Sequence, residues 1–147
     1  MAAKKIQKQF TLNLVAGKAT PQPPVGPTLG QNGINIGTFI KEFNDKTREL
    51  ASKFGGVEIK VPCKISVYID RSYDFEIMPP ITSNLLLWKA KQTAWSAEPN
   101  KKKIATLTQQ DLEEVADIKL SVMNTRRKPS ILKTLAWTCK NMGIEVK

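Results

Sequence analysis

The chain has no histidine, and its two cysteines, Cys63 and Cys139, lie far apart in the sequence and outside any CxxC pattern. Common zinc sites, histidine general bases and Ser-His or Cys-His nucleophile pairs need residues that this composition does not supply. We therefore expect no metal, no cofactor and no catalytic thiol. Both cysteines are interpreted as small packing residues of a protein kept in a reducing compartment.

Long apolar runs are missing as well. No stretch approaches the roughly 20 apolar residues that a membrane span needs, and a strand pattern follows residues 1–5 where a signal peptide would have its apolar core. These patterns favour an intracellular, cytoplasmic protein without a membrane partner.

Acidic residues are in the minority, with 13 against 23 lysines and arginines, and the net charge is +10. The excess is shared evenly, with 11 basic and 6 acidic residues up to Phe75 and 12 and 7 after it. Such a balance in a small chain favours a polyanionic partner, with nucleic acid ahead of an acidic membrane. The carboxylates fall mostly on expected helix surfaces, and residues 17–20 lack the glycine spacing of a phosphate-binding loop, so no enzymatic chemistry is predicted.

No charged residue lies between Lys18 and Lys41, and residues 17–36 are rich in proline and glycine. Proline fixes φ and glycine permits positive φ, so this segment is predicted to be an ordered, kinked connection. With few side chains to bury, it is interpreted as a surface offered to a partner. The alternative is an elaborate turn between a strand and a helix.

The first half of the chain predicts an α/β domain over residues 1–75. Residues 10–15 alternate like a half-buried strand, and residues 36–54 have the spacing of an amphipathic helix that starts after Asn35 and ends at Gly55-Gly56. Three alternating runs follow at 57–61, 65–69 and 73–77, with breaks at Pro62 and at 70–72. They predict a three-stranded antiparallel meander covered by the helix.

A semi-rigid linker is predicted at 76–80, where Pro79 and Pro80 follow the last strand. From residue 81 to 147 the apolar spacing predicts three helices: residues 82–94, a second helix opened by a capping box at 108–111, and residues 130–142. The predicted fold class is therefore α+β, with a small antiparallel sheet in the first domain and an all-α three-helix bundle in the second.

The second domain carries the most informative charge pattern. Between Ile118 and Ile144 there is no acidic residue, and the basic ones are Lys119, Arg126, Arg127, Lys128, Lys133 and Lys140. Lys133, Trp137, Lys140 and Asn141 share one stripe of the third helix, opposite its apolar side. With the polar connection 95–103 and its three lysines, this stripe predicts a nucleic-acid interface. The alternatives are an ordinary solvated helix face and, for Trp137, an aromatic ring that covers the bundle core.

Several sequences together resemble one family: AGKATPQPPVGPTLGQNGINI, FIKEFN, SVYIDRSYDFEI, the Pro-Pro before a leucine-rich helix, EPNKKK and TCKNMGIEV. In this order they resemble the bacterial-type large-subunit ribosomal protein L eleven family over nearly the whole chain. The resemblance implies an N-terminal α/β domain and a C-terminal homeodomain-like domain that binds rRNA of the GTPase-associated centre at the stalk base. It also implies a non-catalytic component of a cytoplasmic ribosome, an organellar ribosome being the less favoured reading.

The partners implied by the resemblance are large-subunit rRNA, the stalk proteins, elongation factor G, elongation factor Tu and the stringent-response synthetase. The family also binds thiopeptide antibiotics between the proline-rich segment and the rRNA. Factor- and antibiotic-facing residues would be Pro21, Pro23, Pro24, Pro27, Gly30 and Gln31. Ala2 and Lys41 would be possible methylation sites.

The residues that would bind rRNA are Lys89, Asn100, Lys101, Lys102, Lys103, Arg126, Arg127, Lys133, Trp137, Thr138, Lys140, Asn141 and Gly143. One departure stands out, since Trp137 occupies a position where the family usually has a glycine. A DNA-binding regulator built on the same three helices is the alternative function, and an unrecognised enzyme is a distant third.

Overall fold

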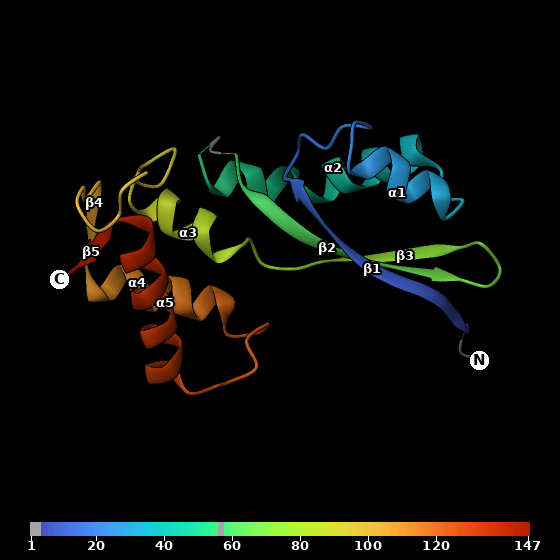
Figure 1. Ribbon diagram of the computed structural model, residues 1–147. Helices are drawn as coiled ribbons and strands as arrows, with labels where there is room; N and C mark the ends of the chain where they lie inside the picture. Colours follow the sequence, from blue (N-terminus) through green and yellow to red (C-terminus); the bar gives the residue numbers. More distant parts are fainter. Residues whose placement is uncertain (1–3, 56–57) are drawn as a thin grey trace. The chain divides into compact units, whose positions relative to one another are not determined.

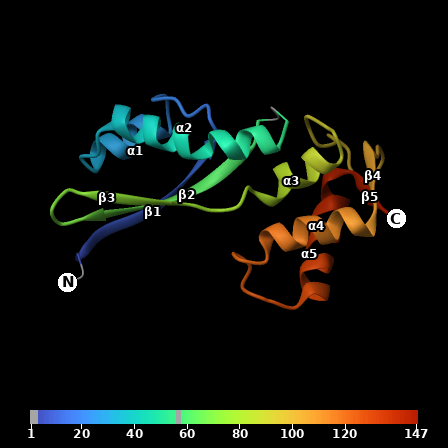
Figure 2. The same cartoon turned by 180° about the vertical axis from the view of Figure 1, so that it is seen from behind.

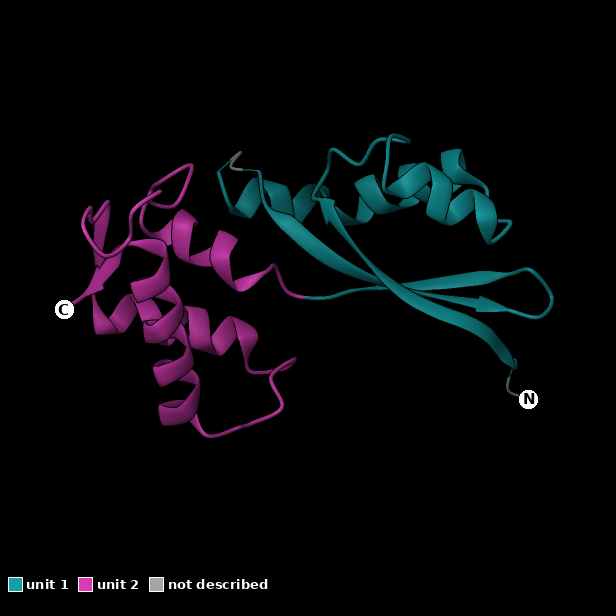
Figure 3. Cartoon of the chain, in the orientation of Figure 1, with its two compact units in different colours: residues 1–78 teal, residues 79–147 magenta. Residues whose placement is uncertain are grey.

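The computed structural model describes residues 4–55 and 58–147 and divides the chain into two compact units, residues 1–78 and 79–147 (Figure 3). Within the first unit, β1 (Ile6–Val15), β2 (Lys60–Tyr68) and β3 (Tyr73–Ile77) form an antiparallel sheet in the order β1-β2-β3. Helices α1 (Val25–Gln31) and α2 (Ile36–Lys53) lie over one face of this sheet (Figures 1 and 2). Two-residue alternation of apolar side chains explains why only that face is covered.

The core of the first unit lies between α2 and the sheet. Phe39 and Phe43 of α2 are fully buried, and the Phe39 ring packs edge-on against Tyr73 and Phe75 of β3. The helix begins where predicted, because the side chain of Asn35 accepts a hydrogen bond from the Thr38 amide at 3.3 Å. Aromatic packing therefore fixes α2 above β3.

The prediction of which segments form the three strands was wrong in one respect. Runs 57–61 and 65–69 were expected to be separate strands, but β2 is continuous through Pro62, and β1 supplies the third strand; Val57 lies outside the described residues. The Pro62 carbonyl accepts from the Met78 amide at 2.9 Å, so the backbone of Pro62 faces the position just beyond the end of β3. The missing N–H of proline is tolerated there because β3 does not extend to this position. Glu76 and Ile77, assigned to the linker from sequence, belong to β3.

Helix α1 was not predicted within the proline-rich segment. Its seven residues are too few for a helical period to be recognised, yet Val25 and Leu29, one turn apart, are both buried in the core. Pro27 is compatible with the helix because it lies in the first turn, where the backbone N–H has no intrahelical partner.

The second unit contains α3 (Thr82–Lys89), β4 (Ala105–Leu107), α4 (Gln109–Lys119), α5 (Lys128–Met142) and β5 (Ile144–Val146). The capping box is confirmed, since Thr108 and Asp111 at the start of α4 exchange side-chain and backbone hydrogen bonds. The first helix is shorter than predicted and ends at Lys89. The unit is also not all-α, because β4 and β5 form a parallel pair whose three-residue strands are too short to produce an alternating pattern. The α+β class of the whole chain is confirmed.

No helix in the described part of the chain is long and apolar enough to cross a membrane.

Candidate nucleic-acid interface

Helix α5 has an apolar side and an exposed polar side. Ile131, Leu135, Cys139 and Met142 are buried against the rest of the unit. Lys133, Trp137, Lys140 and Asn141 are all exposed, and we call these four residues the α5 stripe. The indole of Trp137 remains 56% exposed, so this side chain does not cover the core. Two cations, a ring and an amide are thus available on one helix face.

Arg126 and Arg127 extend the cationic surface at the start of α5, where both are exposed. Two other basic residues of this region are not available in the same way. Lys119 is only 8% exposed, and burial lowers the pKa of its ammonium group. Lys128 forms an ion pair with Asp117 at 3.2 Å. The positive surface is therefore smaller than the sequence indicated.

The basic loop, residues 95–103, is fastened to the C-terminal end of α5. The Ser96 amide donates to the Met142 carbonyl at 3.0 Å, and the Ile104 amide donates to the Gly143 carbonyl at 2.9 Å. Within the loop, the amides of Lys101 and Lys102 both donate to the Glu98 carbonyl. These backbone bonds hold the loop beside the end of the α5 stripe.

Four predicted contact residues lie on this loop, and all four are exposed: Asn100, Lys101, Lys102 and Lys103. The ammonium of Lys103 donates to the Pro99 carbonyl at 2.8 Å. The loop therefore presents Asn100, Lys101 and Lys102 to solvent, while Lys103 also bonds within the loop.

Gly143 does not fit its predicted role as an RNA contact, because it is buried. It caps α5 in the left-handed conformation with φ 81°. A Cβ atom there would lie 2.6 Å from Cβ of Ser96 and 3.1 Å from the Lys102 carbonyl oxygen. Only glycine allows the basic loop to approach this closely, so Gly143 acts by positioning the loop.

Lys89 is also partly withdrawn from solvent. Its side chain is 16% exposed, forms an ion pair with Glu114 and places Nζ 5.0 Å from the centre of the Trp88 ring. The charge of Lys89 is thus compensated within the unit, which the sequence did not indicate. Thr138 is partly exposed, and its hydroxyl donates to the Thr134 carbonyl at 3.0 Å, which leaves it free only as an acceptor.

The first unit presents a different, uncharged surface. All six residues predicted to face factors or antibiotics are exposed: Pro21, Pro23, Pro24, Pro27, Gly30 and Gln31. Lys41 is exposed on α2, and Ala2 lies outside the described residues.

Two α2 residues that sequence reasoning missed hold this segment in place. Asn44 accepts from the Ala19 amide at 2.9 Å, and the fully buried hydroxyl of Thr47 accepts from the Gly17 amide at 2.9 Å. A threonine on the apolar stripe of α2 was the available signal, because a buried hydroxyl needs a partner.

The two cysteines are buried and unpaired, as predicted for packing residues. Burial raises the pKa of Cys63 to about 12 and that of Cys139 to about 11, so both thiols stay protonated at neutral pH.

An α/β unit followed by a largely helical unit with an exposed cationic helix is the arrangement of a two-module nucleic-acid-binding protein, and the comparisons with known proteins identify the nucleic acid as RNA. Residues 10–73 match the family model "Ribosomal protein L11, N-terminal domain", and residues 78–146 match "Ribosomal protein L11, RNA binding domain". The chain belongs to the large ribosomal subunit protein uL11 family.

Two relatives illustrate the similarity. The chain is 44% identical to large ribosomal subunit protein uL11 of Sulfurimonas denitrificans over 144 residues, which cover 98% of each chain. It is 42% identical to the same protein of a Hydrogenobaculum species over 145 residues, or 99% of this chain and 97% of the relative. The chain is therefore a structural, non-enzymatic component of the large subunit with an RNA-binding domain, and the enzyme alternative is wrong.

Proposed function

We propose that residues 79–147 bind the rRNA of the GTPase-associated centre at the stalk base, through the α5 stripe, Arg126, Arg127 and the basic loop. The exposed α5 stripe carries this proposal, because its two lysines can neutralise phosphates while Asn141 and Trp137 offer hydrogen bonds and a stacking surface. A folded RNA would be recognised mainly by shape, with counterion release supplying much of the affinity. The alternative of a DNA-binding regulator has no specific support in the structure.

We further propose that residues 1–78 face the translational GTPases, the stalk proteins and the stringent-response synthetase through the proline-rich surface, on a cytoplasmic ribosome. The proline-rich surface supports this proposal because it is exposed, carries no charge and is attached to α2 by Asn44 and Thr47. A rigid, uncharged surface suits protein partners and thiopeptide antibiotics better than it suits phosphates. Lys41, which is exposed, and Ala2 remain proposed methylation sites.

The rRNA proposal is tested by measuring the binding of the full chain to a transcript of the GTPase-associated centre over a range of salt concentrations. The double variant Lys133→Glu/Lys140→Glu should bind more weakly, and its slope of log K against log salt should fall by about 2, one for each phosphate that a lysine no longer neutralises. Lys53→Glu/Lys60→Glu, with the same charge change on exposed lysines of the first unit, is the matched control. An unchanged slope in the α5 double variant would refute the proposed face.

The factor-facing proposal is tested with Pro24→Ser in reconstituted large subunits. Because Pro24 is exposed and lies in the first unit, rRNA affinity should stay nearly intact while factor-stimulated GTP turnover changes. Loss of rRNA binding in this variant would show that the two units had been assigned the wrong partners.

A further inference from the structure

Strand β3 is an edge of the sheet, and one side of its backbone is free. Next to its two ends, the Tyr68 amide bonds to the Ser72 carbonyl and the Met78 amide bonds to the Pro62 carbonyl, both at 2.9 Å. Antiparallel pairing alternates, so residues 72, 74, 76 and 78 point their backbone groups toward β2, whereas Tyr73, Phe75 and Ile77 point theirs away. In the ranges 4–55 and 58–147, no residue hydrogen-bonds to these outward groups.

The two edges of the sheet differ in how well they are protected against a further strand. The β1 edge has a bulge between Ile6 and Lys8 and a cluster of lysines at its start, both of which discourage strand addition. The five residues of β3, Tyr-Asp-Phe-Glu-Ile, include neither lysine nor proline. Its protective features are its short length and the charges of Asp74 and Glu76, both on the face away from α2.

A cleft of about 520 Å³ lies beside this edge, lined by Thr38, Glu42 and Lys46 of α2 and by residues 71–75. Tyr73 and Phe75 direct their rings toward α2, where Phe75 meets Phe39 at a centroid distance of 5.3 Å. Nζ of Lys46 lies 4.2 Å from the centre of the Phe75 ring. A strand added to β3 would therefore place every second side chain over this cleft.

On the α2 side of the edge, the cleft has two cations, Lys46 and Arg71, and one carboxylate, Glu42, because alternation along β3 puts the Asp74 side chain on the opposite face. The carboxylate of Glu42 accepts from the Tyr73 hydroxyl at 3.3 Å, and that of Asp74 accepts from the Tyr68 hydroxyl at 2.9 Å. Lys46 and Arg71 form no ion pair with any carboxylate of the described residues.

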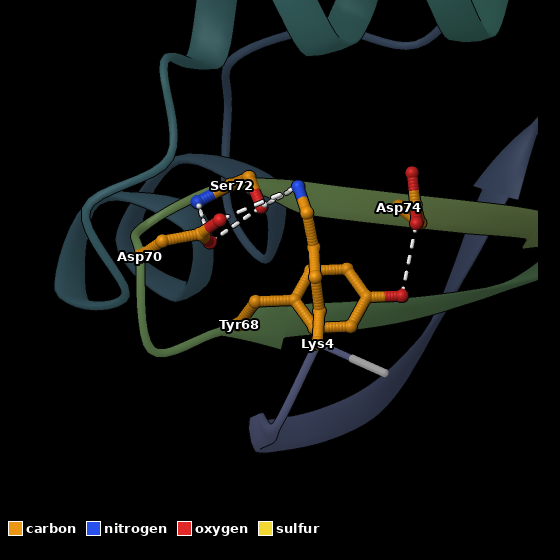
Figure 4. A network of polar contacts seen from close by, with 5 residues as sticks. All are labelled: Lys4, Tyr68, Asp70, Ser72 and Asp74. Atoms are coloured by element: carbon orange, nitrogen blue, oxygen red, sulfur yellow. Dashed lines mark hydrogen bonds and ion pairs between the residues drawn. The ribbon is translucent and has the colours of Figure 1, made fainter. Parts of the chain in front are cut away.

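The turn that carries Arg71 is held by its neighbours. Asp70 accepts from the Ser72 amide at 3.0 Å and pairs with Lys4 at 3.3 Å, as Figure 4 shows. Arg71 itself has a positive φ of 65° within this turn. Its place in the lining of the cleft is thus set by the turn.

We propose that the β3 edge and its cleft form a docking site for an extended segment of a partner protein. The segment adds to β3 as a further strand and directs acidic side chains at alternate positions toward Lys46 and Arg71. Between them it has neutral side chains, because Asp74 and Glu76 occupy the other face of the strand. A protein backbone is the matching partner, since it alone supplies alternating donors and acceptors at strand spacing.

This site is separate from the proline-rich surface and does not depend on rRNA binding. The test uses the full chain labelled with nitrogen-15 and an acetylated, amidated octapeptide of alternating Glu and Thr. In the free protein the amides of Tyr73, Phe75 and Ile77 should exchange with solvent faster than those of Asp74 and Glu76. Addition of the peptide should slow exchange at these three amides.

Two control peptides separate backbone pairing from charge. Methylation of alternate peptide nitrogens removes the donors that a strand needs and should abolish the protection, and replacement of Glu by Lys should weaken binding. The variant Lys46→Gln/Arg71→Asn should weaken binding of the Glu peptide by about three- to tenfold, since each exposed ion pair contributes little. Asparagine tolerates the positive φ at position 71. Lys53→Gln, on the same helix but outside the cleft, should leave binding unchanged.

Several results would overturn the proposal: no exchange effect at millimolar peptide, binding without protection of the three amides, equal binding of the methylated peptide, or equal binding of the Lys peptide. Protection that grows with protein concentration alone would also overturn it, because a second copy of this chain would then be the partner at the edge.

Discussion

Two irregular segments, the proline-rich segment in the first unit and the basic loop in the second, are attached to their helices by different means. The proline-rich segment is held by side chains, with Asn44 and Thr47 bonding to its backbone and Val25 and Leu29 inserted into the core. The basic loop is held mainly by backbone hydrogen bonds to the end of α5 and by its close approach to Gly143. An attachment through side chains can be removed by substituting one residue at a time. An attachment through the backbone is lost only when an added side chain displaces the loop.

The largest expected effect is that of Gly143→Ala. The added Cβ meets Ser96 and a backbone carbonyl, and the position requires positive φ, so we expect the second unit to lose about 3 kcal/mol of unfolding free energy. Affinity for rRNA should fall at the same time because the basic loop is displaced. Urea unfolding followed by amide signals of each unit gives the measurement.

Gly33→Ala is the matched control for Gly143→Ala, because Gly33 has φ 72° with no atom near its missing Cβ. Gly33→Ala should lower the unfolding free energy of the first unit by about 1 kcal/mol, which is the cost of the positive φ alone. Equal losses in the two variants would mean that steric contact with the loop is unimportant.

Leu29→Ala should have a nearly equal effect on the first unit. Leu29 is fully buried, and its truncation leaves a cavity under α1, with an expected loss of about 3 kcal/mol. The α5 stripe lies in the other unit, so rRNA affinity should stay within about twofold, roughly 0.4 kcal/mol. Gln31→Ala, an exposed change on the same helix, should leave stability nearly unaltered, and a similar loss there would contradict the anchoring role of Leu29.

Thr47→Val isolates one hydrogen bond of the side-chain attachment. Valine keeps the shape but leaves the Gly17 amide without its acceptor, which should cost about 1–2 kcal/mol and speed exchange of that amide. Thr47→Ser keeps the hydroxyl and should retain slow exchange. Fast exchange in the serine variant would show that the methyl group, and not the bond, matters.

The smallest effect concerns pH and the start of α4. Hydrogen bonds from the Thr108 backbone and hydroxyl hold the pKa of Asp111 below its usual range. A carboxyl whose pKa is lower in the folded state stabilises the fold above its unfolded pKa and loses that effect as pH falls through the folded value. Between pH 7 and pH 3 the wild type should therefore lose more stability than Asp111→Asn, by less than about 1 kcal/mol. Parallel pH profiles of the two proteins would exclude this contribution.

Much of this arrangement could be predicted from local patterns in the sequence. The amphipathic spacing of α2 and α5 fixed their buried faces, and the Thr108-Asp111 capping box fixed where α4 begins. A helix with several turns of regular apolar spacing, or with a capping motif, can be predicted because the residues that determine it are close together in the sequence.

What escaped prediction depends on contacts between distant residues. Continuity of β2 through Pro62 depends on where β3 ends, and the burial of Gly143 depends on the position of Ser96. Similarly, the partner of Lys89 is Glu114, on another helix. A sequence pattern reveals which side chains could be exposed, but it does not reveal which of them are already paired.

The parallel pair β4–β5 ties the last residues of the chain to its second unit. The Lys147 amide donates to the Leu107 carbonyl at 2.9 Å, and the Gln109 amide donates to the Lys147 carbonyl at 3.1 Å. During synthesis the first unit can fold as soon as its own residues have emerged, whereas the second unit cannot close before β5 and Lys147 have emerged. A nascent chain would therefore acquire its RNA-binding shape after its first unit is already formed.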